Sequence, residues 1–582
     1  MIGLISATAA GATARDRLAA AWPDRTRSYT GPTVREAVER AFAECDELVC
    51  FLATGATVRL LAPLLAGKAT DPGVVCVDEA QQYAVALLGG HAGGANELAG
   101  AVADVLPGCR PVITTATDAA GIPGLDTLGW PVEGAVAAVT RALLDGAPVT
   151  LRATAQWPLP ALPPHVTPPG GGAGPYLPAA GDTAAAPPTL WVTDQVIPLG
   201  PGDVVLRPPS LVIGVGASSG VCGDEVLELI EGVLDDAGLS ARSVTELATV
   251  DAKAGEPGLL AAADRLRVPL RTYPAEVLAG IEVPNPSDAP RAAVGTPSVA
   301  EAAALAVAGE GYELLVPKAK SAPQGRPAMA TAAVARRRPR GRLSVVGIGP
   351  GARDLLTPRA RAELRRASVL VGLDQYVEQI RDLLRPGTRV LESGLGAEEL
   401  RARTAVAEAR AGHSVALIGS GDAGVYAMAS PALAEATGEI DVVGVPGVTA
   451  ALAAAAVLGA PLGHDHVSIS LSDLHTPWEV IEHRVRAAAE SDIVVTFYNP
   501  RSRGRDWQLP KALGILAEHR TPRTPVGVVR AASRPDEHAT LTTLGALDPA
   551  TVDMMTVVTV GNTATRAIAG RMVTPRGYRW QS

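Results

Sequence analysis

Short apolar runs alternate with amphipathic stretches along this chain, and glycine-rich turns join them at several places. In one such unit, residues 342–346 form an apolar run that ends in Gly347, Gly349 and Gly351, and a helical pattern follows over residues 360–369. Glycines allow a backbone to approach a ligand at the carboxyl end of a strand, where open α/β sheets bind their ligands. The alternation therefore predicts α/β domains built on parallel sheets with right-handed crossovers.

The length and charge of the chain narrow the classes of protein to consider. At 582 residues it exceeds what one hydrophobic core supports, so several domains are expected. It is 47% hydrophobic but only 3% aromatic, and cores of Ala, Val and Leu suit layered α/β domains. The net charge of −9 argues against general nucleic-acid binding, which needs a basic surface. An anionic substrate must therefore meet local arginines.

The cysteines and the apolar segments indicate a cytoplasmic protein. The five cysteines are odd in number and no two have CxxC spacing, so we expect reduced thiols and no zinc or iron–sulfur site. The first residues run directly into Arg15 and Arg17 without a basic leader, as a first strand would rather than a signal peptide. The longest weakly polar run, residues 449–462, is shorter than a membrane span requires. We expect neither a membrane nor a nucleic acid as partner.

Changes in composition divide the chain into six predicted parts. Residues 156–188 are rich in Pro, Gly and Ala, and residues 321–340 are rich in Ala, Pro and Arg, so both read as linkers or irregular segments. The predicted parts are an α/β domain over 1–137, a middle region over 138–209, a second α/β domain over 210–320, a linker over 321–341, and two further α/β domains over 342–450 and 451–582.

Four loops that follow four strands in the last 240 residues form the strongest pattern. They are residues 347–351, 419–426, 444–450 and 497–500, and their glycines would line one crevice with backbone groups, with Asp422 as the one carboxylate at its rim. In this order the loops resemble the tetrapyrrole methyltransferases, specifically the precorrin-3B (or cobalt-factor III) C17-methyltransferases of corrin biosynthesis. The resemblance covers residues 343 to about 571.

The resemblance implies a class III fold with S-adenosylmethionine in the cleft between two domains, and usually a homodimer through this half. It also implies methylation at C17 with ring contraction and closure of a lactone on the ring-A acetate. An acid or base would assist this reaction, with His475, Tyr498 and Arg530 as candidates, Arg530 also as a substrate-binding residue; a structural role is equally open for each. Carried over, the donor would contact Gly349, Pro350, Gly351, Gly421, Asp422, Val425, Thr449, Ala450, Tyr498 and Ala531.

The first 320 residues resemble a second family. Residues 74–97 and 111–118 look like the N-terminal part of the cobalt-precorrin-5A hydrolases, and residues 249–258, 283–287, 295–301 and 316–320 look like their C-terminal domain. The implied reaction opens the ring-A lactone and releases the extruded carbon with its methyl group as acetaldehyde. Attack by water needs a base and an oxyanion stabiliser, so we expect His91 or Glu97 as the base and the Gly93 and Gly94 amides near the developing charge. Alternatively, Glu97 is a helix N-terminal residue and the glycines form a plain turn.

The hydrolase-like half leaves further alternatives open. Asp251, Lys253, Glu256 and Lys318 either bind the acidic tetrapyrrole or form an ion-pair network that closes the domain. Where the family commonly has two arginines, the loop over residues 214–220 has serines, which weakens this site and leaves a tetrapyrrole-holding role without hydrolysis as an alternative. The glycines of this loop also fit an NADP-dependent oxidoreductase. The sequence does not decide whether the substrate carries cobalt.

Overall fold

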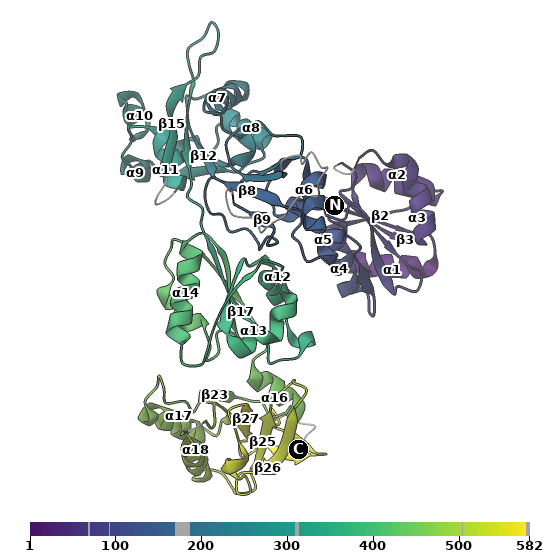
Figure 1. Cartoon of the computed structure of the whole chain (residues 1–582), viewed down its shortest axis with the longest axis vertical. Coiled ribbons are helices and arrows are strands. Elements are labelled where there is room, and N and C mark those ends of the chain that lie inside the picture. The colour runs from purple at the N-terminus through teal and green to yellow at the C-terminus, as the bar shows by residue number, and fades with distance from the viewer. Residues whose placement is uncertain (68–69, 92, 169–186, 309–312, 503, 578–582) are drawn as a thin grey trace, which may run out of the picture. The chain divides into compact units, whose positions relative to one another are not determined.

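The computed structural model describes residues 1–67, 70–91, 93–168, 187–308, 313–502 and 504–577. The chain divides into two compact units (Figure 1). The first consists of residues 1–156, 162–339 and 385–387, and the second of residues 157–161, 340–384 and 388–582. Residues 169–186, which form much of the expected Pro/Gly-rich segment, lie outside the described residues. Among the described residues, no helix is long and apolar enough to cross a membrane, and no cluster of His, Cys, Asp or Glu could hold a metal ion.

The first sheet has six strands, and helices cover both of its faces (Figure 1). Its order is β2 (Thr26–Tyr29), β1 (Ile2–Ser6), β3 (Glu47–Phe51), β4 (Gly73–Val77), β5 (Tyr83–Leu88) and β6 (Arg110–Val112). Alternate strand residues pack on α1 (Ala9–Ala21) and α4 (Ala95–Val105) on one face, and on α2 (Val34–Glu44) and α3 (Thr54–Leu61) on the other. The prediction of an all-parallel sheet is wrong at β5, which runs antiparallel to β4. Residues 78–82 turn directly between these strands and are too few for a crossover.

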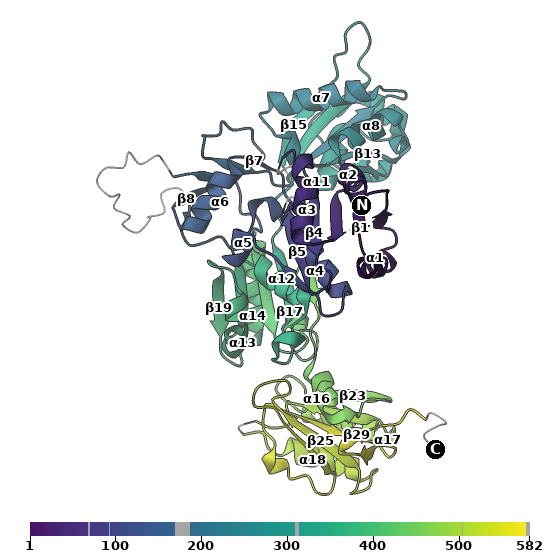
Figure 2. The same cartoon turned by 90° about the vertical axis from the view of Figure 1, so that its right-hand side faces the viewer.

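A second, smaller sheet follows, and the sequence did not indicate it (Figure 2). Its order is β7 (Val132–Gly134), β11 (Val204–Leu206), β10 (Thr189–Val192), β8 (Val149–Ala153) and β9 (Val166–Thr167), with α5 (Ala116–Ala119) and α6 (Val136–Asp145) beside it. Its strands have only two to five residues each, and proline-rich sequence separates them, so their periodicity is too short to recognise.

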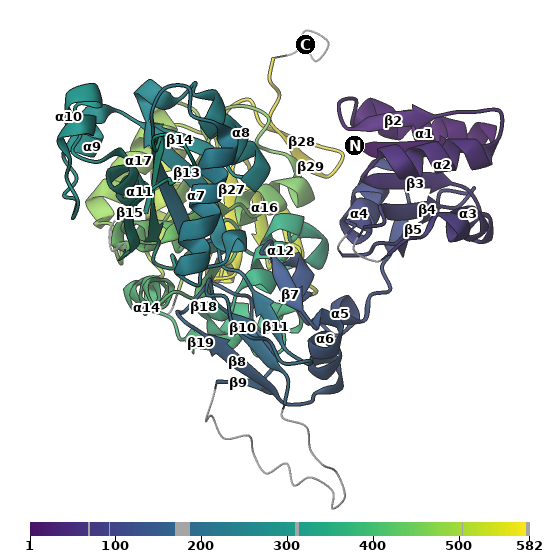
Figure 3. The same cartoon turned by 90° about the horizontal axis from the view of Figure 1, so that it is seen from above.

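The third sheet has five strands, and one of them lies in the segment predicted to be a linker (Figure 3). Its order is β14 (Leu270–Tyr273), β13 (Val244–Val250), β12 (Leu211–Ala217), β16 (Ala330–Arg336) and β15 (Glu313–Lys320), with α7 (Gly223–Asp236) and α8 (Pro257–Leu266) on one face and α9 (Ala275–Ala279) and α11 (Val299–Ala308) on the other; α10 (Asp288–Val294) precedes α11. Strand β16 is antiparallel to both β12 and β15 and most of its residues are buried, so the prediction of a linker over 321–341 is wrong there. Its alanines lack the usual signal of a strand; Ala330 and Ala332 pack in the core with α7 and α8, and Ala335 packs with Ala304 and Leu305 of α11.

Two arginines of the predicted linker, Arg336 and Arg337, have acidic partners. Arg336 Nε lies 2.8 Å from Asp194 Oδ2, and Arg337 is ion-paired with the buried Glu246. A basic linker facing solvent is therefore not what these side chains form.

The second unit contains two α/β sheets (Figure 1). The first is fully parallel, in the order β19 (Arg389–Ser393), β18 (Val369–Leu373), β20 (Ser414–Gly419), β17 (Arg342–Gly347) and β21 (Asp441–Val445). Its faces are covered by α14 (Glu398–Arg410) and α15 (Ala429–Glu435) on one side and by α12 (Pro358–Arg366) and α13 (Asp374–Ile380) on the other. The sequence located four of these strands and missed β19.

The second of these sheets is mixed. Its order is β23 (His466–Ser470), β24 (Val494–Tyr498), β27 (Thr556–Val560), β25 (Pro525–Arg530) and β26 (His538–Thr543), and the small sheet β22 (Gly459–Ala460), β29 (Arg571–Val573) and β28 (Arg566–Ile568) adjoins it. The helices are α16 (Ala450–Leu458), α17 (Trp478–Glu490) and α18 (Gln508–Ala517). Strands β23, β24 and β25 point the same way, so their carboxyl ends lie at one edge. The predicted α/β class with several domains is confirmed.

Candidate functional sites

The glycine loops predicted from the sequence meet at the carboxyl ends of β20, β17 and β21. Gly349 N–H donates to Gly421 O at 3.0 Å, and Gly421 N–H donates back to Gly349 O at 2.8 Å. A Cβ on Gly347 would lie 2.7 Å from Gly421 O and 2.8 Å from Gly447 N. The three loops therefore contact each other through backbone atoms alone, which only glycine permits at this spacing.

Asp422 fastens two of these loops to each other. Its Oδ1 accepts from Gly424 N–H at 2.8 Å and its Oδ2 from Gly447 N–H at 2.9 Å. Val425 lies in the same turn, with its N–H donating to Asp422 O. The carboxylate charge is thus balanced by backbone dipoles, and the side chain is a structural part of the rim.

Tyr498 and Thr449 join the ends of β24 and α16. The Tyr498 hydroxyl lies 2.6 Å from Thr449 Oγ1 and accepts from Ala451 N–H at 2.8 Å. Thr449 is the N-cap of α16 but makes no side-chain cap of its own, so the tyrosine hydroxyl satisfies a free amide of the first turn. Burial raises the pKa of the Tyr498 hydroxyl, and its hydrogen bonds with Thr449 and Ala451 oppose this shift. A protonated hydroxyl that makes two hydrogen bonds is suited to holding the ends of β24 and α16 in position rather than to transferring a proton.

Residues after β25 hold the glycine loop from the second sheet of this unit. Ser533 Oγ accepts from Ala352 N–H at 3.2 Å, and Arg534 Nε donates to Pro350 O at 3.0 Å. A Cβ on Gly351 would lie 2.6 Å from Arg534 Cγ. Ser533 and Arg534 were missed by the sequence analysis, although the strand end at Ala531 was noticed.

Four residues other than glycine take the left-handed conformation in these loops: Tyr426, Asn499, Ala531 and Ser533 have φ between 49° and 65°. Such backbone costs roughly 1–3 kcal/mol per residue and persists where the surroundings fix it, which is typical of functional sites. The rings of Tyr426 and Tyr498 pack with centroids 5.3 Å apart, so one strained loop supports the tyrosine of another.

The side chains of the two other candidates of this unit, Arg530 and His475, make no hydrogen bond to the loops just described among the described residues. Arg530 donates to Asp553 Oδ2 and to Asp536 Oδ2, at 2.8 Å each, so its charge is already compensated by two carboxylates. His475 is exposed in the segment after β23, with no hydrogen bond among the described residues. Their roles in catalysis and substrate binding stay predictions.

In the first unit, His91 lies in a polar cluster at the carboxyl ends of β5 and β6. His91 Nε2 lies 2.9 Å from Thr117 Oγ1 and 3.6 Å from Asp118 Oδ2. Asn96 Nδ2 donates to Thr115 Oγ1 at 3.0 Å and to Asp118 Oδ2 at 3.1 Å, and Thr115 Oγ1 donates to the same carboxylate oxygen at 2.5 Å. The sequence analysis identified His91 but missed these partners.

The expected oxyanion donors have other bonds. Gly93 N–H donates to Gly89 O and Gly94 N–H to His91 O, at 3.0 Å each, so both amides are already hydrogen-bonded, and their place near a developing charge stays a prediction. Glu97 is exposed in the first turn of α4, and its negative charge helps to raise the pKa of Glu47, although burial of Glu47 is the main cause. No contact among the described residues joins Glu97 to His91.

The four predicted substrate-binding residues of this half fall into separate places. Lys253 Nζ donates to Ser219 Oγ at 2.7 Å and pairs with Glu256 Oε2 at 3.1 Å, while Glu256 Oε1 accepts from Gly220 N–H. The lysine and then the Gly220 amide lower the pKa of Glu256. The pair thus holds the serine-containing loop that replaces the expected arginines.

Lys318 and Asp251 do not join that pair. Lys318 Nζ donates to Asn285 O, its backbone N–H donates to the fully buried Glu301, and Asp251 is exposed.

The first glycine of that loop, Gly214, packs against a helix. A Cβ on Gly214 would lie 1.8 Å from Ala300 O, because α11 packs directly on β12 at this point. The residue is therefore required for helix–sheet packing, which removes the main support for an NADP-dependent oxidoreductase.

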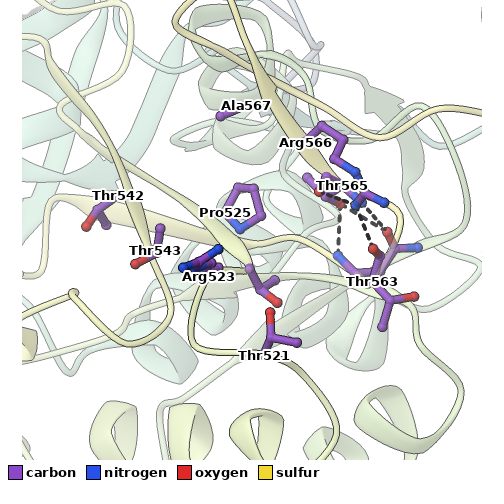
Figure 4. Close-up of a pocket in the computed structure, with 11 residues that line it drawn as sticks. Thr521, Arg523, Pro525, Thr542, Thr543, Thr563, Thr565, Arg566 and Ala567 are labelled. Atoms are coloured by element: carbon purple, nitrogen blue, oxygen red, sulfur yellow. Dashed lines mark hydrogen bonds between the residues drawn. The ribbon is translucent and has the colours of Figure 1, made fainter.

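A cavity of about 290 Å³ lies elsewhere in the second unit (Figure 4). Six threonines and two arginines contribute to its lining, and Arg566 Nη1 donates to Thr563 O beside it. Pro525, at the amino end of β25, also lines it, whereas Ala531 and Ser533 follow the carboxyl end of the same strand. A strand of this length spans about 20 Å, so the cavity is separate from the glycine loops.

Three family models match different parts of the chain. Residues 342–548 match the Tetrapyrrole (Corrin/Porphyrin) Methylases, residues 211–335 match Cobalamin synthesis G C-terminus, and residues 36–118 match Cobalamin synthesis G N-terminal. The match to Cobalamin synthesis G C-terminus includes all but the last residue of β16. The match to Cobalamin synthesis G N-terminal ends at Asp118.

Known relatives match the second unit. A probable cobalt-factor III C(17)-methyltransferase of Salmonella typhimurium is 47% identical over 239 residues, which is 40% of this chain and 99% of that protein. The precorrin-3B C(17)-methyltransferase of Sinorhizobium sp is 40% identical, over 41% of this chain and 97% of that protein. The cobalamin biosynthesis protein CobIJ of Mycobacterium bovis is 41% identical, but the match covers only 48% of that longer protein. The crystal structure of the methyltransferase CobJ matches with 40% identity and a TM-score of 0.39, over 40% of this chain and 100% of that one.

The near-complete coverage of two C(17)-methyltransferases at 40% identity or more identifies the second unit. The chain therefore belongs to the tetrapyrrole methylase family through residues 342–548, and it carries the two cobalamin synthesis G domains ahead of that methylase.

Proposed function

We propose that this chain is a bifunctional enzyme of cobalamin biosynthesis. Its second unit methylates C17 of precorrin-3B or cobalt-factor III with ring contraction, and its first unit opens the ring-A lactone of cobalt-precorrin-5A with release of acetaldehyde. The observation that carries the proposal is the presence, in one chain, of a whole C17-methyltransferase and of both cobalamin synthesis G domains.

S-adenosylmethionine is the proposed methyl donor, and when bound it supplies a methyl group on a positively charged sulfonium. The residues proposed to hold it are Gly349, Pro350, Gly351, Gly421, Asp422, Val425, Thr449, Ala450, Tyr498 and Ala531. The backbone atoms of these loops suit such a ligand. Asp422 is the one carboxylate among the residues just named, and two backbone amides already balance its charge.

A rim without free carboxylates has a chemical advantage. The positive charge of the donor disappears as the methyl group leaves, so a strong counter-charge would stabilise the ground state more than the transition state. Alignment and exclusion of water then supply most of the rate, and well-oriented pairs gain roughly 7–11 kcal/mol. The loops joined through Gly349, Gly421 and Tyr498 are built for alignment.

The hydrolase half joins the same sequence of reactions. The lactone that the methyltransferase closes is the group that the hydrolase opens after a further methylation by another enzyme. Tethering both activities would limit the escape of intermediates, and we propose a homodimer through the methyltransferase half.

The test uses the whole chain and three substrates. We expect S-adenosylmethionine with precorrin-3B or cobalt-factor III to give a product heavier by one methyl group, with its mass measured. The comparison between the two also decides whether the macrocycle must carry cobalt. Cobalt-precorrin-5A should release acetaldehyde, trapped as its hydrazone; methylation without acetaldehyde would instead support a first unit that only holds tetrapyrroles.

A further inference from the structure

We propose that Asp118, rather than His91 or Glu97, is the general base of the hydrolase half. The inference rests on the hydrolase activity proposed above and names the residue that carries it. Asp118 lies in α5, directly after β6, and His91 follows the neighbouring parallel strand β5. The two side chains meet at the carboxyl edge of the sheet, where α/β proteins place their ligands.

Hydrogen-bond donors converge on one oxygen of the Asp118 carboxylate. Oδ2 accepts from Thr115 Oγ1 at 2.5 Å and from Asn96 Nδ2 at 3.1 Å, with His91 Nε2 3.6 Å away. Asn96 is buried, so this support is held inside the domain. A carboxylate anchored through one oxygen has a fixed direction for the other.

The second oxygen is the available one. Among the described residues Oδ1 of Asp118 has no hydrogen-bond partner, and its side chain is 40% exposed. The anchored oxygen thus points into the domain's polar cluster, and the free oxygen is left for a water molecule. A general base needs this combination of fixed orientation and access to the reacting proton.

His91 lacks that access. Its side chain is only 15% exposed, its Nε2 is engaged with Thr117, and its Nδ1 is buried with no partner among the described residues. Neither ring nitrogen is free to meet a water molecule on the substrate. His91 is therefore a positioning residue, which holds Thr117 and lies beside the anchored oxygen of Asp118.

The proposed step balances as an ordinary hydrolysis. Oδ1 of Asp118 takes a proton from water as the water oxygen bonds to the lactone carbonyl carbon. The acyl C–O bond then breaks, and the leaving alkoxide receives that proton from the Asp118 carboxyl group. In the second step the new hydroxyl group returns its proton to Asp118 and becomes the carbonyl of acetaldehyde, while its carbon's bond to the ring breaks and the electron pair enters the conjugated macrocycle, which is then protonated.

The experiment compares the full-length Asp118→Asn variant with the unmodified full-length protein. Acetaldehyde release and methylation are measured on the same preparation of each. We expect Asp118→Asn to lower acetaldehyde release at least 100-fold, a typical contribution of a general base. Methylation by the second unit should stay within twofold, which shows that the second unit is intact, and an unchanged unfolding temperature of the first unit shows that it folds. Asp104→Asn, which alters an exposed carboxylate on α4, is the matched control and should change neither rate.

A chemical rescue separates a base from a merely structural carboxylate. Asp118→Gly should be inactive alone and should regain acetaldehyde release when formate is added, because formate can occupy the vacated position. His91→Gln should lower the rate less than Asp118→Asn and should not respond to formate.

The outcomes separate the two levels of inference. Acetaldehyde release by Asp118→Asn within twofold of the unmodified protein overturns the assignment and leaves the hydrolase function standing. The same holds if Glu97→Gln abolishes release while Asp118→Asn does not. Absence of acetaldehyde from the unmodified protein, with methylation intact, overturns the proposed function of this half and the assignment with it.

Discussion

The hydroxyl of Tyr498 lies 2.6 Å from Oγ1 of Thr449 and receives the N–H of Ala451, so a tyrosine at the end of one sheet caps a helix that begins beside another. Replacing Tyr498 by Phe removes the hydroxyl and keeps the ring packing on Tyr426. Loss of a helix cap costs about 1 kcal/mol, so we expect a lower unfolding temperature for the second unit and a several-fold higher dissociation constant for S-adenosylmethionine. Calorimetry measures both.

The raised pKa of Tyr498 also gives a pH prediction. Because burial keeps the phenol protonated above its ordinary pKa of about 10, the methylation rate should show no ionisation of Tyr498 between pH 6 and about 10. Tyr498→Phe should therefore shift the level of the pH–rate profile and not its shape. Loss of a basic limb in Tyr498→Phe would mean that the hydroxyl transfers a proton.

Pro350 stiffens the glycine loop, and its carbonyl accepts from Arg534 Nε. Pro350→Gly keeps the carbonyl but frees the backbone, at an entropic cost of about 0.4–1 kcal/mol. We expect the dissociation constant of S-adenosylmethionine to rise by about twofold to fivefold, measured by titration calorimetry. Arg534→Met is the companion variant, because it removes the donor and keeps much of the side chain over Gly351. Unchanged donor binding in both variants would remove this loop from the donor site.

The glycine loops could be predicted from the sequence because the backbone conformation they need, with positive φ, is one that glycine adopts readily. Gly349, Gly351 and Gly421 all have positive φ, and each lies just after the carboxyl end of a strand. Side-chain partners cannot be predicted in this way. Arg530 and Arg534 are equivalent in the sequence, yet two aspartates compensate the first and the second contacts Pro350.

The cluster around Asp118 could not be predicted from the sequence for a different reason. His91 and Thr117 are 26 residues apart, and they meet only because β5 and β6 are neighbours in the sheet. Strand order is a tertiary property, and periodicity does not report it. Strand β16 was missed because it consists largely of alanine and lacks the run of β-branched residues that marks a strand.

The close approach of α11 to β12 makes a prediction for the third sheet. A methyl group on Gly214 would overlap Ala300 O, so Gly214→Ala should displace the helix and destabilise the first unit by about 1–3 kcal/mol, as overpacking typically does. Gly220→Ala is the comparison, since no atom lies within 4 Å of its Cβ position and only its positive φ opposes the change. Thermal unfolding should show the larger effect for Gly214→Ala. Tight NADP binding by the unmodified chain would contradict the packing role of this loop.

The buried pair of Lys253 and Glu256 gives the remaining prediction. The depressed pKa of Glu256 means that its contribution to stability is present above its unfolded pKa and is lost as the pH falls through the lower, folded value. Lys253→Met leaves the Glu256 carboxylate, whose side chain is 8% exposed, with the Gly220 amide but without its cation, so we expect a loss of stability at pH 7. The double variant Lys253→Met with Glu256→Gln should recover part of it, because no charge is then buried. Calorimetric unfolding of the first unit from pH 4 to 8 checks the single and the double variant. An unchanged unfolding temperature of Lys253→Met, together with a raised KM for the tetrapyrrole, would show instead that Lys253 binds substrate.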